Sequence, residues 1–201
     1  MDSIILASNS PRRRDILTNL NIPFIVFGVK VEERIKNKRN IKCSVIDNAK
    51  RKAKAACEHF SSGLVLGADT VVFFNGRVLG KPGNRDEAYR FLRMLSGNRH
   101  DVYSGLTVYD AAQKRGYSSC STTEVYFTKI GERELREYVE SGEWIGKAGG
   151  YAVQGRASLF IEKIVGSFFN VMGLPVEELY RILKRFEYFE NPGRYMPVRR
   201  N

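Results

Sequence analysis

The chain has 201 residues, of which 43% are hydrophobic and 27% charged, so it can bury one sizeable core, arranged as one domain or as two small lobes. No apolar stretch approaches the ~20 residues of a membrane span and no charged leader is visible, so we expect a soluble, cytoplasmic protein with no membrane partner. Three cysteines without ligand-like spacing and only two histidines argue against a disulfide framework, a zinc site and histidine-centred catalysis.

The formal net charge of +11 favours a polyanionic partner, such as nucleic acid, an anionic membrane or a phosphorylated small molecule. Part of the excess lies between Arg34 and Lys54, where nine basic residues accompany one acid, and part in the tail from Lys184 to Arg200. A solvated helix face and a loosely held tail explain most of these charges. The remaining basic residues belong to motifs.

The first element predicted is a strand over residues 3–7, followed by a helix with Ser10 as its N-cap and Pro11 at its first position. Free backbone N–H groups at such a helix start, together with Arg12 and Arg13, can bind phosphate. Taken alone, the segment fits an ordinary helix with surface arginines equally well.

A second strand is predicted over residues 24–29, and Glu33 follows it. A carboxylate there can hold magnesium or pair with a neighbouring lysine, and the local sequence does not decide between the two. The next helix is predicted to begin near Ser44 as its cap, with Lys52 bordering its apolar face and able to reach inward. The apolar positions of this helix are Val45, Ile46, Ala49, Ala53, Ala56 and Phe60.

The most informative stretch is an apolar, β-branched strand over residues 65–74 that carries Asp69 in its middle. A buried carboxylate is costly unless a cation, a metal or hydrogen-bond donors meet it, so Asp69 predicts a polar site beside this strand. An aspartate satisfied by local backbone is the alternative. A hairpin signal at Asn75-Gly76 turns the chain back and is expected to bring Lys81 near Asp69.

The remaining pattern indicates alternating helices and strands, ending in a loosely held tail beyond Phe186. The elements predicted are a helix over 86–95 stopped by Gly97, strands over 100–109 and 117–128, a helix over 132–139, a glycine-rich loop over 147–155, a strand over 159–165, a turn over 166–170 and a helix opened by Pro175.

These motifs together closely resemble the Maf family of nucleoside triphosphate pyrophosphatases, which are related in fold to the inosine triphosphate pyrophosphatases. The resemblance covers about residues 4–186, and it suggests a domain over 1–188 followed by a basic tail over 189–201. The motifs that carry it are Leu6-Ala7-Ser8-Asn9-Ser10-Pro11-Arg12-Arg13, Ala49-Lys50-Arg51-Lys52-Ala53, Gly67-Ala68-Asp69-Thr70, Gly80-Lys81-Pro82, Leu95-Ser96-Gly97, Lys147-Ala148-Gly149-Gly150-Tyr151 and Gly173-Leu174-Pro175.

The resemblance implies an α/β fold with a mixed, elongated sheet, flanking helices, a cleft between two lobes and a homodimer. It also implies hydrolysis of a nucleoside triphosphate between its α and β phosphates, with Mg²⁺ or Mn²⁺ required. The residues it assigns are Ser8, Arg12, Arg13 and Lys147 for the substrate, Lys52 and Lys81 for developing charge, and Glu33 with Asp69 for the metal or for water activation.

Three positions at which the family divides into branches, Arg12, Thr70 and Gln154, resemble the branch acting on dTTP and UTP, possibly also on modified pyrimidine nucleotides. The Gln154 amide can both donate to and accept from a pyrimidine edge. Two other readings stay open: a nucleic-acid-binding module, which leaves Asp69 unexplained, and a non-catalytic nucleotide-binding regulator of cell division. Because the tail lies outside the resemblance, its deletion from Asn191 onward is expected to leave hydrolysis intact.

Overall fold

The computed structural model describes residues 1–35 and 40–200, so Lys36, Lys38 and Arg39 of the basic run lie outside the described residues. The chain forms two compact units, each assembled from separate segments. Unit 1 comprises Met1–Asp69, Ser104–Ser121 and Gly173–Asn201, and unit 2 comprises Thr70–Tyr103 and Thr122–Met172. Three of the boundaries fall inside long strands, β4 (Leu64–Phe74), β6 (Arg99–Asp110) and β7 (Arg115–Phe127). The chain therefore passes from one unit to the other along strands.

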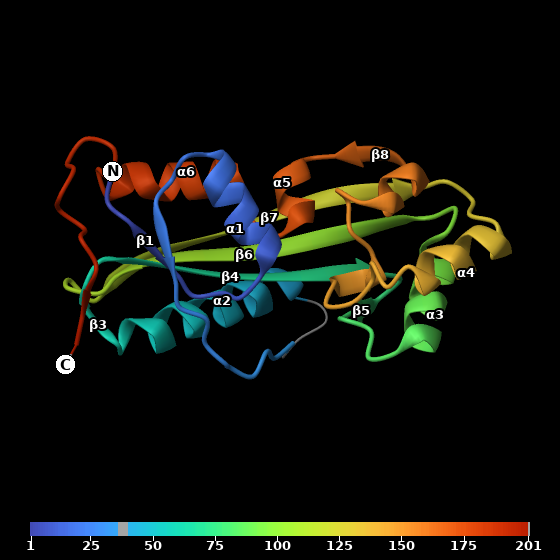
Figure 1. The fold of residues 1–201 in the computed structure, drawn as a ribbon, viewed down its shortest axis with the longest axis horizontal. Coiled ribbons are helices and arrows are strands. Elements are labelled where there is room, and N and C mark those ends of the chain that lie inside the picture. Colours follow the sequence, from blue (N-terminus) through green and yellow to red (C-terminus); the bar gives the residue numbers. More distant parts are fainter. Residues whose placement is uncertain (36–39, 201) are drawn as a thin grey trace. The chain divides into compact units, whose positions relative to one another are not determined.

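Seven strands form one mixed sheet in the order β2–β1–β4–β6–β7–β8, with β5 paired to β4. The shorter strands are β1 (Ile4–Leu6), β2 (Phe24–Val26), β5 (Arg77–Leu79) and β8 (Ile161–Val165). Strand β1 pairs in parallel with β2 and β4, whereas β4–β5 and β7–β8 are antiparallel. This arrangement confirms the predicted α/β class with a mixed sheet and flanking helices (Figure 1).

The hairpin between β4 and β5 turns at Asn75-Gly76 as predicted, and both turn residues have positive φ angles, 45° and 76°. Such angles fit the right-handed twist of the paired strands, and glycine adopts them without steric cost. The register places Val72 opposite Leu79. The hairpin thus fixes where the Gly80-Lys81-Pro82 segment leaves the sheet.

In unit 1, α1 (Pro11–Asn19) and α6 (Val176–Arg185) cover one face of the strands and α2 (Ile41–Cys57) covers the other (Figure 1). Helix α2 lies directly on the strands because they present glycine to it. A Cβ atom at Gly67 would come within 2.2 Å of the Ala49 carbonyl oxygen, and one at Gly105 within 2.2 Å of the Val45 carbonyl oxygen. This close approach brings the side chains of α2 into contact with β4.

The predicted start of this helix at Ser44 is wrong. The helix begins three residues earlier, because the Asn40 side chain accepts a hydrogen bond from the Cys43 amide at 3.2 Å and so caps it. Ser44 is instead a buried residue inside the helix, and Phe60 lies beyond the helix in β3 (Phe60–Ser62). The apolar positions Val45, Ala49, Ala53 and Ala56 are buried as predicted.

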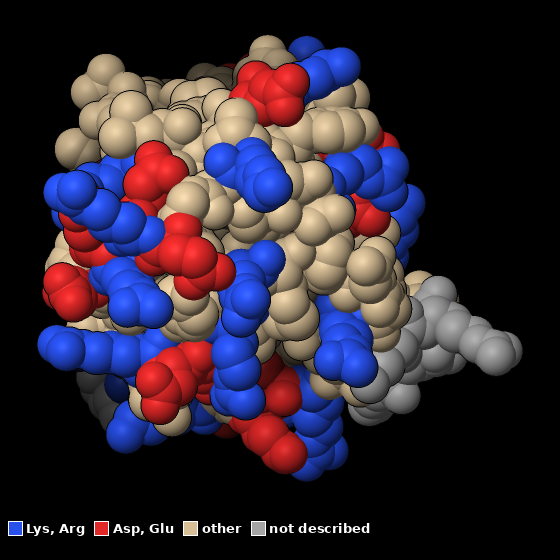
Figure 2. All heavy atoms as spheres, turned by 90° about the vertical axis from the view of Figure 1, so that its right-hand side faces the viewer, with Lys and Arg blue, Asp and Glu red and all other residues tan. Residues whose placement is uncertain are grey.

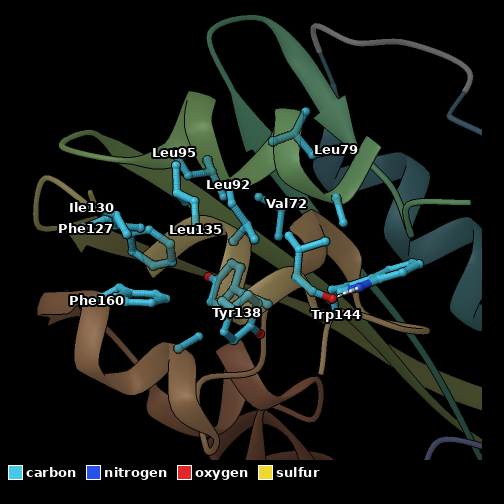
Figure 3. Packing of buried hydrophobic residues seen from close by; sticks show 14 of the residues in the cluster. Val72, Leu79, Leu92, Leu95, Phe127, Ile130, Leu135, Tyr138, Trp144 and Phe160 are labelled. Carbon is cyan, nitrogen blue, oxygen red and sulfur yellow. Dashed lines mark hydrogen bonds between the residues drawn. The ribbon is translucent and has the colours of Figure 1, made fainter. Parts of the chain in front are cut away.

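Unit 2 contains a hydrophobic core between its strands and the helices α3 (Arg85–Leu95) and α4 (Glu132–Glu140) (Figure 3). Val72, Leu92 and Tyr138 meet in it, and the Trp144 indole N–H donates to the Val139 carbonyl oxygen at 2.9 Å. Two short 3₁₀ segments, η1 (Ala148–Gly150) and η2 (Arg156–Phe160), precede β8. The predicted strand over 159–165 therefore starts later, and the predicted turn over 166–170 overlaps a short helix, α5 (Phe168–Met172).

His100 belongs to this core. Its Nε2 lies 2.7 Å from the Tyr151 hydroxyl, and its ring packs edge-on against Phe127 and Tyr151. Burial lowers the pKa of His100 to about 4, so the imidazole is neutral near pH 7. His100 thus packs within this core.

The tail beyond Phe186 is not loosely held, contrary to the prediction. Both carboxylate oxygens of Asp2 accept backbone N–H groups of the tail, from Gly193 at 2.7 Å and from Tyr195 at 2.6 Å. Strand β9 (Val198–Arg199) then pairs antiparallel with β3 (Figure 1). The prediction failed because the tail is anchored by hydrogen bonds to residues far away in sequence, which leave no local pattern.

Candidate functional site

The most unusual group of charges in unit 1 is centred on Lys52. Its ammonium nitrogen lies 2.8 Å from Asp69 Oδ1 and 2.7 Å from Glu33 Oε1, and it also donates to the Ala68 carbonyl oxygen at 3.2 Å. Lys52 is 8% exposed and Asp69 only 2%, whereas Glu33 is exposed. The structure therefore brings three predicted site residues together, and the buried carboxylate has the cation that the strand pattern required.

Helix α2 supplies more to this group than Lys52. Asn48 and Lys52 are four residues apart on α2, and both are buried. Residues at this spacing share one face of a helix, so both side chains face β4. The Asn48 side-chain amide donates to Asp69 Oδ2 at 2.9 Å, which makes Asn48 a site residue that the sequence reasoning missed. The detectable signal was a polar residue four positions before an inward-reaching lysine.

A second group lies at the start of α1. The Arg13 guanidinium donates to Ser8 Oγ at 2.9 Å and to the Gly173 carbonyl oxygen at 2.8 Å. Burial lowers the pKa of Arg13, and the negative charges of Asp69 and Glu33 oppose this shift. Arg13 is therefore held in the field of the two carboxylates. Arg12, the next predicted residue, is half-buried.

Helix α1 begins at Pro11 with Ser10 in the N-cap position, as predicted, but the Ser10 side chain makes no capping hydrogen bond. The Ser8 hydroxyl oxygen instead accepts from the Ser10 amide at 3.3 Å. Ser8 thus orders the turn between β1 and α1 and at the same time orients Arg13. The start of a helix favours an anion, through its backbone N–H groups and the helix dipole.

The predicted site residues of unit 2 lie on two adjoining loops and on β4. The Gly149 amide donates to the Gly80 carbonyl oxygen at 2.9 Å, which ties the loop of Lys147 to the loop of Lys81. Gly149 has a φ of +70°, and a Cβ atom there would lie 2.9 Å from the Val72 side chain, so only glycine fits. Lys81 is exposed, which leaves its charge available to an anionic ligand.

Gln154 is exposed on a turn that a partly buried network stabilises. The Glu143 carboxylate accepts hydrogen bonds from the backbone N–H groups of Arg156 at 2.9 Å and Ala157 at 3.4 Å, and from the Tyr138 hydroxyl at 3.0 Å. The first two bonds fix the backbone just after Gln154, and the third orients the carboxylate. Glu143 was not singled out in the sequence, because its partners come from a separate loop. Thr70, the remaining predicted residue, is half-exposed in β4.

The chemistry of the donor set fits a magnesium ion that is shared with a phosphate ligand. Among residues 1–35 and 40–200, no group of three or more His, Cys, Asp or Glu side chains could hold a metal by itself. Mg²⁺, however, is commonly bound by one or two carboxylates together with substrate phosphates and water. Asp69 and Glu33 can supply those two carboxylates, since both lie within hydrogen-bond distance of one ammonium group.

A mixed sheet with a buried lysine–carboxylate group and an arginine-bearing helix start defines an α/β protein that handles phosphate groups. The chain belongs to the Maf family, because the family model described as "Maf-like protein" matches residues 3–186.

Relatives in three organisms share this similarity over nearly their whole length. The chain is 47% identical to a protein of Pelotomaculum thermopropionicum over 94% of this chain and 98% of the relative. It is 44% identical to a protein of Methanosarcina barkeri over 92% and 94%, and 42% identical to one of Bacillus cereus over 93% and 97%. All three relatives are named dTTP/UTP pyrophosphatase.

The neighbouring arginines of α1 provide a prediction about phosphate binding. We expect Arg13→Ala to lower kcat/KM for a nucleoside triphosphate at least ~50-fold, because a charged, oriented guanidinium is lost from the helix start. Arg14→Ala removes the same charge from the exposed side of the helix and should change kcat/KM less than ~3-fold. Steady-state kinetics of both folded variants would measure this, and equal losses would mean that the arginines act only as diffuse charge.

Proposed function

We propose that the chain is a nucleoside triphosphate pyrophosphatase that hydrolyses dTTP and UTP to the monophosphate and pyrophosphate, a housekeeping role in the nucleotide pool. The observation that carries the proposal is the buried Asp69–Lys52 ion pair with Glu33 beside it. Such a group in the middle of a buried strand indicates a role in catalysis more than in stability, because a buried ion pair adds little net stability. The relatives named dTTP/UTP pyrophosphatase support the same reaction.

The reaction must neutralise a highly charged triphosphate, place a water in line with the α-phosphorus and stabilise the departing pyrophosphate. We assign phosphate binding to Ser8, Arg12 and Arg13, with Arg13 oriented by its two hydrogen bonds. Asp69 accepts the proton of the attacking water, and Lys52 keeps that carboxylate oriented. A divalent cation, Mg²⁺ or Mn²⁺, held by Asp69 and Glu33 would neutralise charge on the phosphate oxygens.

The residues of unit 2 are assigned to charge and base recognition. Lys81 and Lys147 are proposed to contact phosphate oxygens, and Thr70 and Gln154 the base. The support for Gln154 is its exposure on a backbone fixed by Glu143, because a recognition group must be both accessible and oriented. The Gln154 amide also favours uracil or thymine, because their N3–H and carbonyl groups match a side chain that both accepts and donates.

One experiment tests the reaction directly. The purified protein is incubated with each nucleoside triphosphate and Mg²⁺, and pyrophosphate and orthophosphate are scored separately. We expect pyrophosphate and the monophosphate from dTTP and UTP, and no reaction when the metal is removed by a chelator. Release of orthophosphate, or no turnover of any triphosphate, would contradict the proposal.

Base preference gives a further prediction. We expect Gln154→Glu to reduce the ratio of kcat/KM for UTP over GTP at least ~10-fold, because a carboxylate cannot donate to a pyrimidine carbonyl. Gln113→Glu makes the same chemical change on the exposed β6–β7 turn and should leave the ratio unchanged. Side-by-side kinetics with dTTP, UTP, CTP and GTP would measure it. A wild-type preference for GTP would refute the pyrimidine assignment.

A nucleic-acid-binding role is less well supported. On the face shown in Figure 2, basic side chains alternate with acidic ones and form no field of one sign, whereas non-specific nucleic-acid binding needs a continuous basic surface. A non-catalytic regulator would keep the phosphate-binding residues without turnover, which the triphosphate screen would reveal.

The location and assembly of the protein are also part of the proposal. The described residues contain no helix with both the length and the apolar character needed to cross a bilayer. We propose a cytoplasmic homodimer, the assembly implied by the family resemblance. Light scattering of the purified protein at several concentrations would measure the oligomeric state.

A further inference from the structure

Asn48 occupies an unusual position for an amide. Its side chain is 1% exposed on the face of α2 that packs against β4, between Val45 and Ala49 of the apolar face. An amide in such a place is costly unless its donor and acceptor are both satisfied. Asn48 is satisfied on both sides: one partner is Asp69, which Lys52 also contacts, and the other is the residue that follows Glu33.

The two hydrogen bonds of Asn48 join two segments that are far apart in sequence, β4 and residues 31–35. Its Nδ2 donates to Asp69 Oδ2 at 2.9 Å, and its Oδ1 accepts the backbone N–H of Arg34 at 3.0 Å. The reverse orientation of the amide would place oxygen against the carboxylate and NH₂ against the N–H group, so the chemistry of the partners fixes the orientation. Asn48 therefore bridges β4 to the segment that carries Glu33.

The segment carrying Glu33 needs such an anchor. Residues 31–35 adopt neither helix nor strand, and Glu32, Glu33 and Arg34 are exposed. Three side chains of α2 hold this segment at successive residues. Arg51 donates a hydrogen bond to the Glu32 carbonyl oxygen, and Lys52 donates one to the Glu33 carboxylate. Asn48 accepts a hydrogen bond from the backbone N–H of Arg34. Of these contacts, only the one from Asn48 comes from a side chain that also binds the second oxygen of Asp69.

We infer that Asn48 is a positioning residue, which sets the distance and orientation between the Asp69 and Glu33 carboxylates by bridging β4 to residues 31–35. The inference rests on the proposed function, because it assumes that these two carboxylates act together on the triphosphate. Lys52 holds one oxygen of each carboxylate, and a single flexible lysine does not fix their relative orientation. The short, planar amide of Asn48 removes that freedom by holding Asp69 at its other oxygen.

The test compares Asn48→Leu, which keeps the branched shape and removes both hydrogen bonds, with Ser44→Ala one turn earlier on α2, where the Ser44 hydroxyl donates back to the Asn40 carbonyl oxygen at 3.4 Å. We expect Asn48→Leu to lower kcat for dTTP at least ~10-fold with KM changed less than ~2-fold, because phosphate binding at α1 is untouched. Ser44→Ala should change neither constant more than ~2-fold. If Asn48→Leu does not fold, Asn48→Ala, which adds no volume, is used in its place.

Two further measurements separate positioning from general loosening of the fold. Hydrogen exchange of a peptide covering residues 31–35 should become at least ~10-fold faster in Asn48→Leu and stay unchanged in Ser44→Ala, since only the former loses the partner of the Arg34 amide. In a Glu33→Gln background, adding Asn48→Leu should lower kcat by less than ~2-fold more, because the group being positioned is already lost.

The outcomes separate this inference from the proposed function. Each of four results would overturn the positioning role. In folded Asn48→Leu they are an unchanged kcat, an effect on KM in place of kcat, and unchanged hydrogen exchange in residues 31–35. In the double variant with Glu33→Gln, the result is a fall in kcat equal to the product of the two single effects. The assignment of the site itself is tested separately, by the turnover of Asp69→Asn. An inactive Asp69→Asn together with a fully active Asn48→Leu would therefore refute the inference and leave the proposed function standing.

Discussion

Asp69→Asn is expected to lower turnover of dTTP at least ~100-fold while the protein remains folded. The asparagine has nearly the same shape, so it fills the same space and keeps an oxygen toward Lys52, with the loss of the hydrogen bond from Asn48. It cannot accept a proton from water and is a poor ligand for a divalent cation. Because the Lys52 ammonium keeps Glu33 as a partner, the variant does not bury an unpaired cation. Turnover is measured as pyrophosphate release, and folding as the thermal unfolding midpoint.

Asp47→Asn is the matched control. Asp47 lies on the exposed side of α2, next to Asn48 in sequence, and its substitution removes one negative charge without touching the group around Lys52. We expect its turnover to stay within ~2-fold of the unaltered protein. Near-normal turnover in folded Asp69→Asn, or an equal loss in both variants, would show that the buried carboxylate has no specific part in the reaction.

Deletion of residues 191–201 is expected to lower the thermal unfolding midpoint by about 6–12 °C. The deletion removes Tyr195, which is 3% exposed and donates to the Phe186 carbonyl oxygen at 2.7 Å. Loss of a buried aromatic side chain costs about 3 kcal/mol or more, and 1 kcal/mol corresponds to about 2–4 °C in a chain of this size. The deletion also removes the two backbone N–H groups that donate to Asp2 and the strand β9 that pairs with β3.

Turnover of the truncated protein at temperatures well below its midpoint should remain normal, as the sequence alone suggested, because the tail makes no hydrogen bond to Ser8, Lys52 or Asp69 among the described residues. Asp2→Asn is the companion variant: it keeps the tail but replaces one acceptor oxygen with an NH₂ group, so we expect a smaller fall in the midpoint. An unchanged midpoint after truncation would mean that the tail packs without stabilising unit 1.

The sequence predicted the elements that depend on local interactions. Pro11 at a helix start, the Asn75-Gly76 turn and Gly97 after α3 each act within a few residues, and all three were found where they were expected. The start of α2 was missed because Asn40 and Ser44 are both acceptable caps, and the burial of Ile41 in the folded chain favours the first. Helix-capping propensity alone does not distinguish Asn40 from Ser44.

The sequence by itself also determined that Asp69 must have a partner, because an unpaired carboxylate in an apolar strand is too costly to bury. Which partner it takes was decided only by the tertiary structure. Gly67 lets α2 approach β4, and that approach places Lys52 and Asn48 on the two oxygens of Asp69, although they are 17 and 21 residues away in sequence. The docking of the tail through Asp2, across 191 and 193 residues, was decided in the same way. Contacts between distant segments form when apolar faces pack and bring polar groups together, and they leave no periodic trace in the sequence from which they could be predicted.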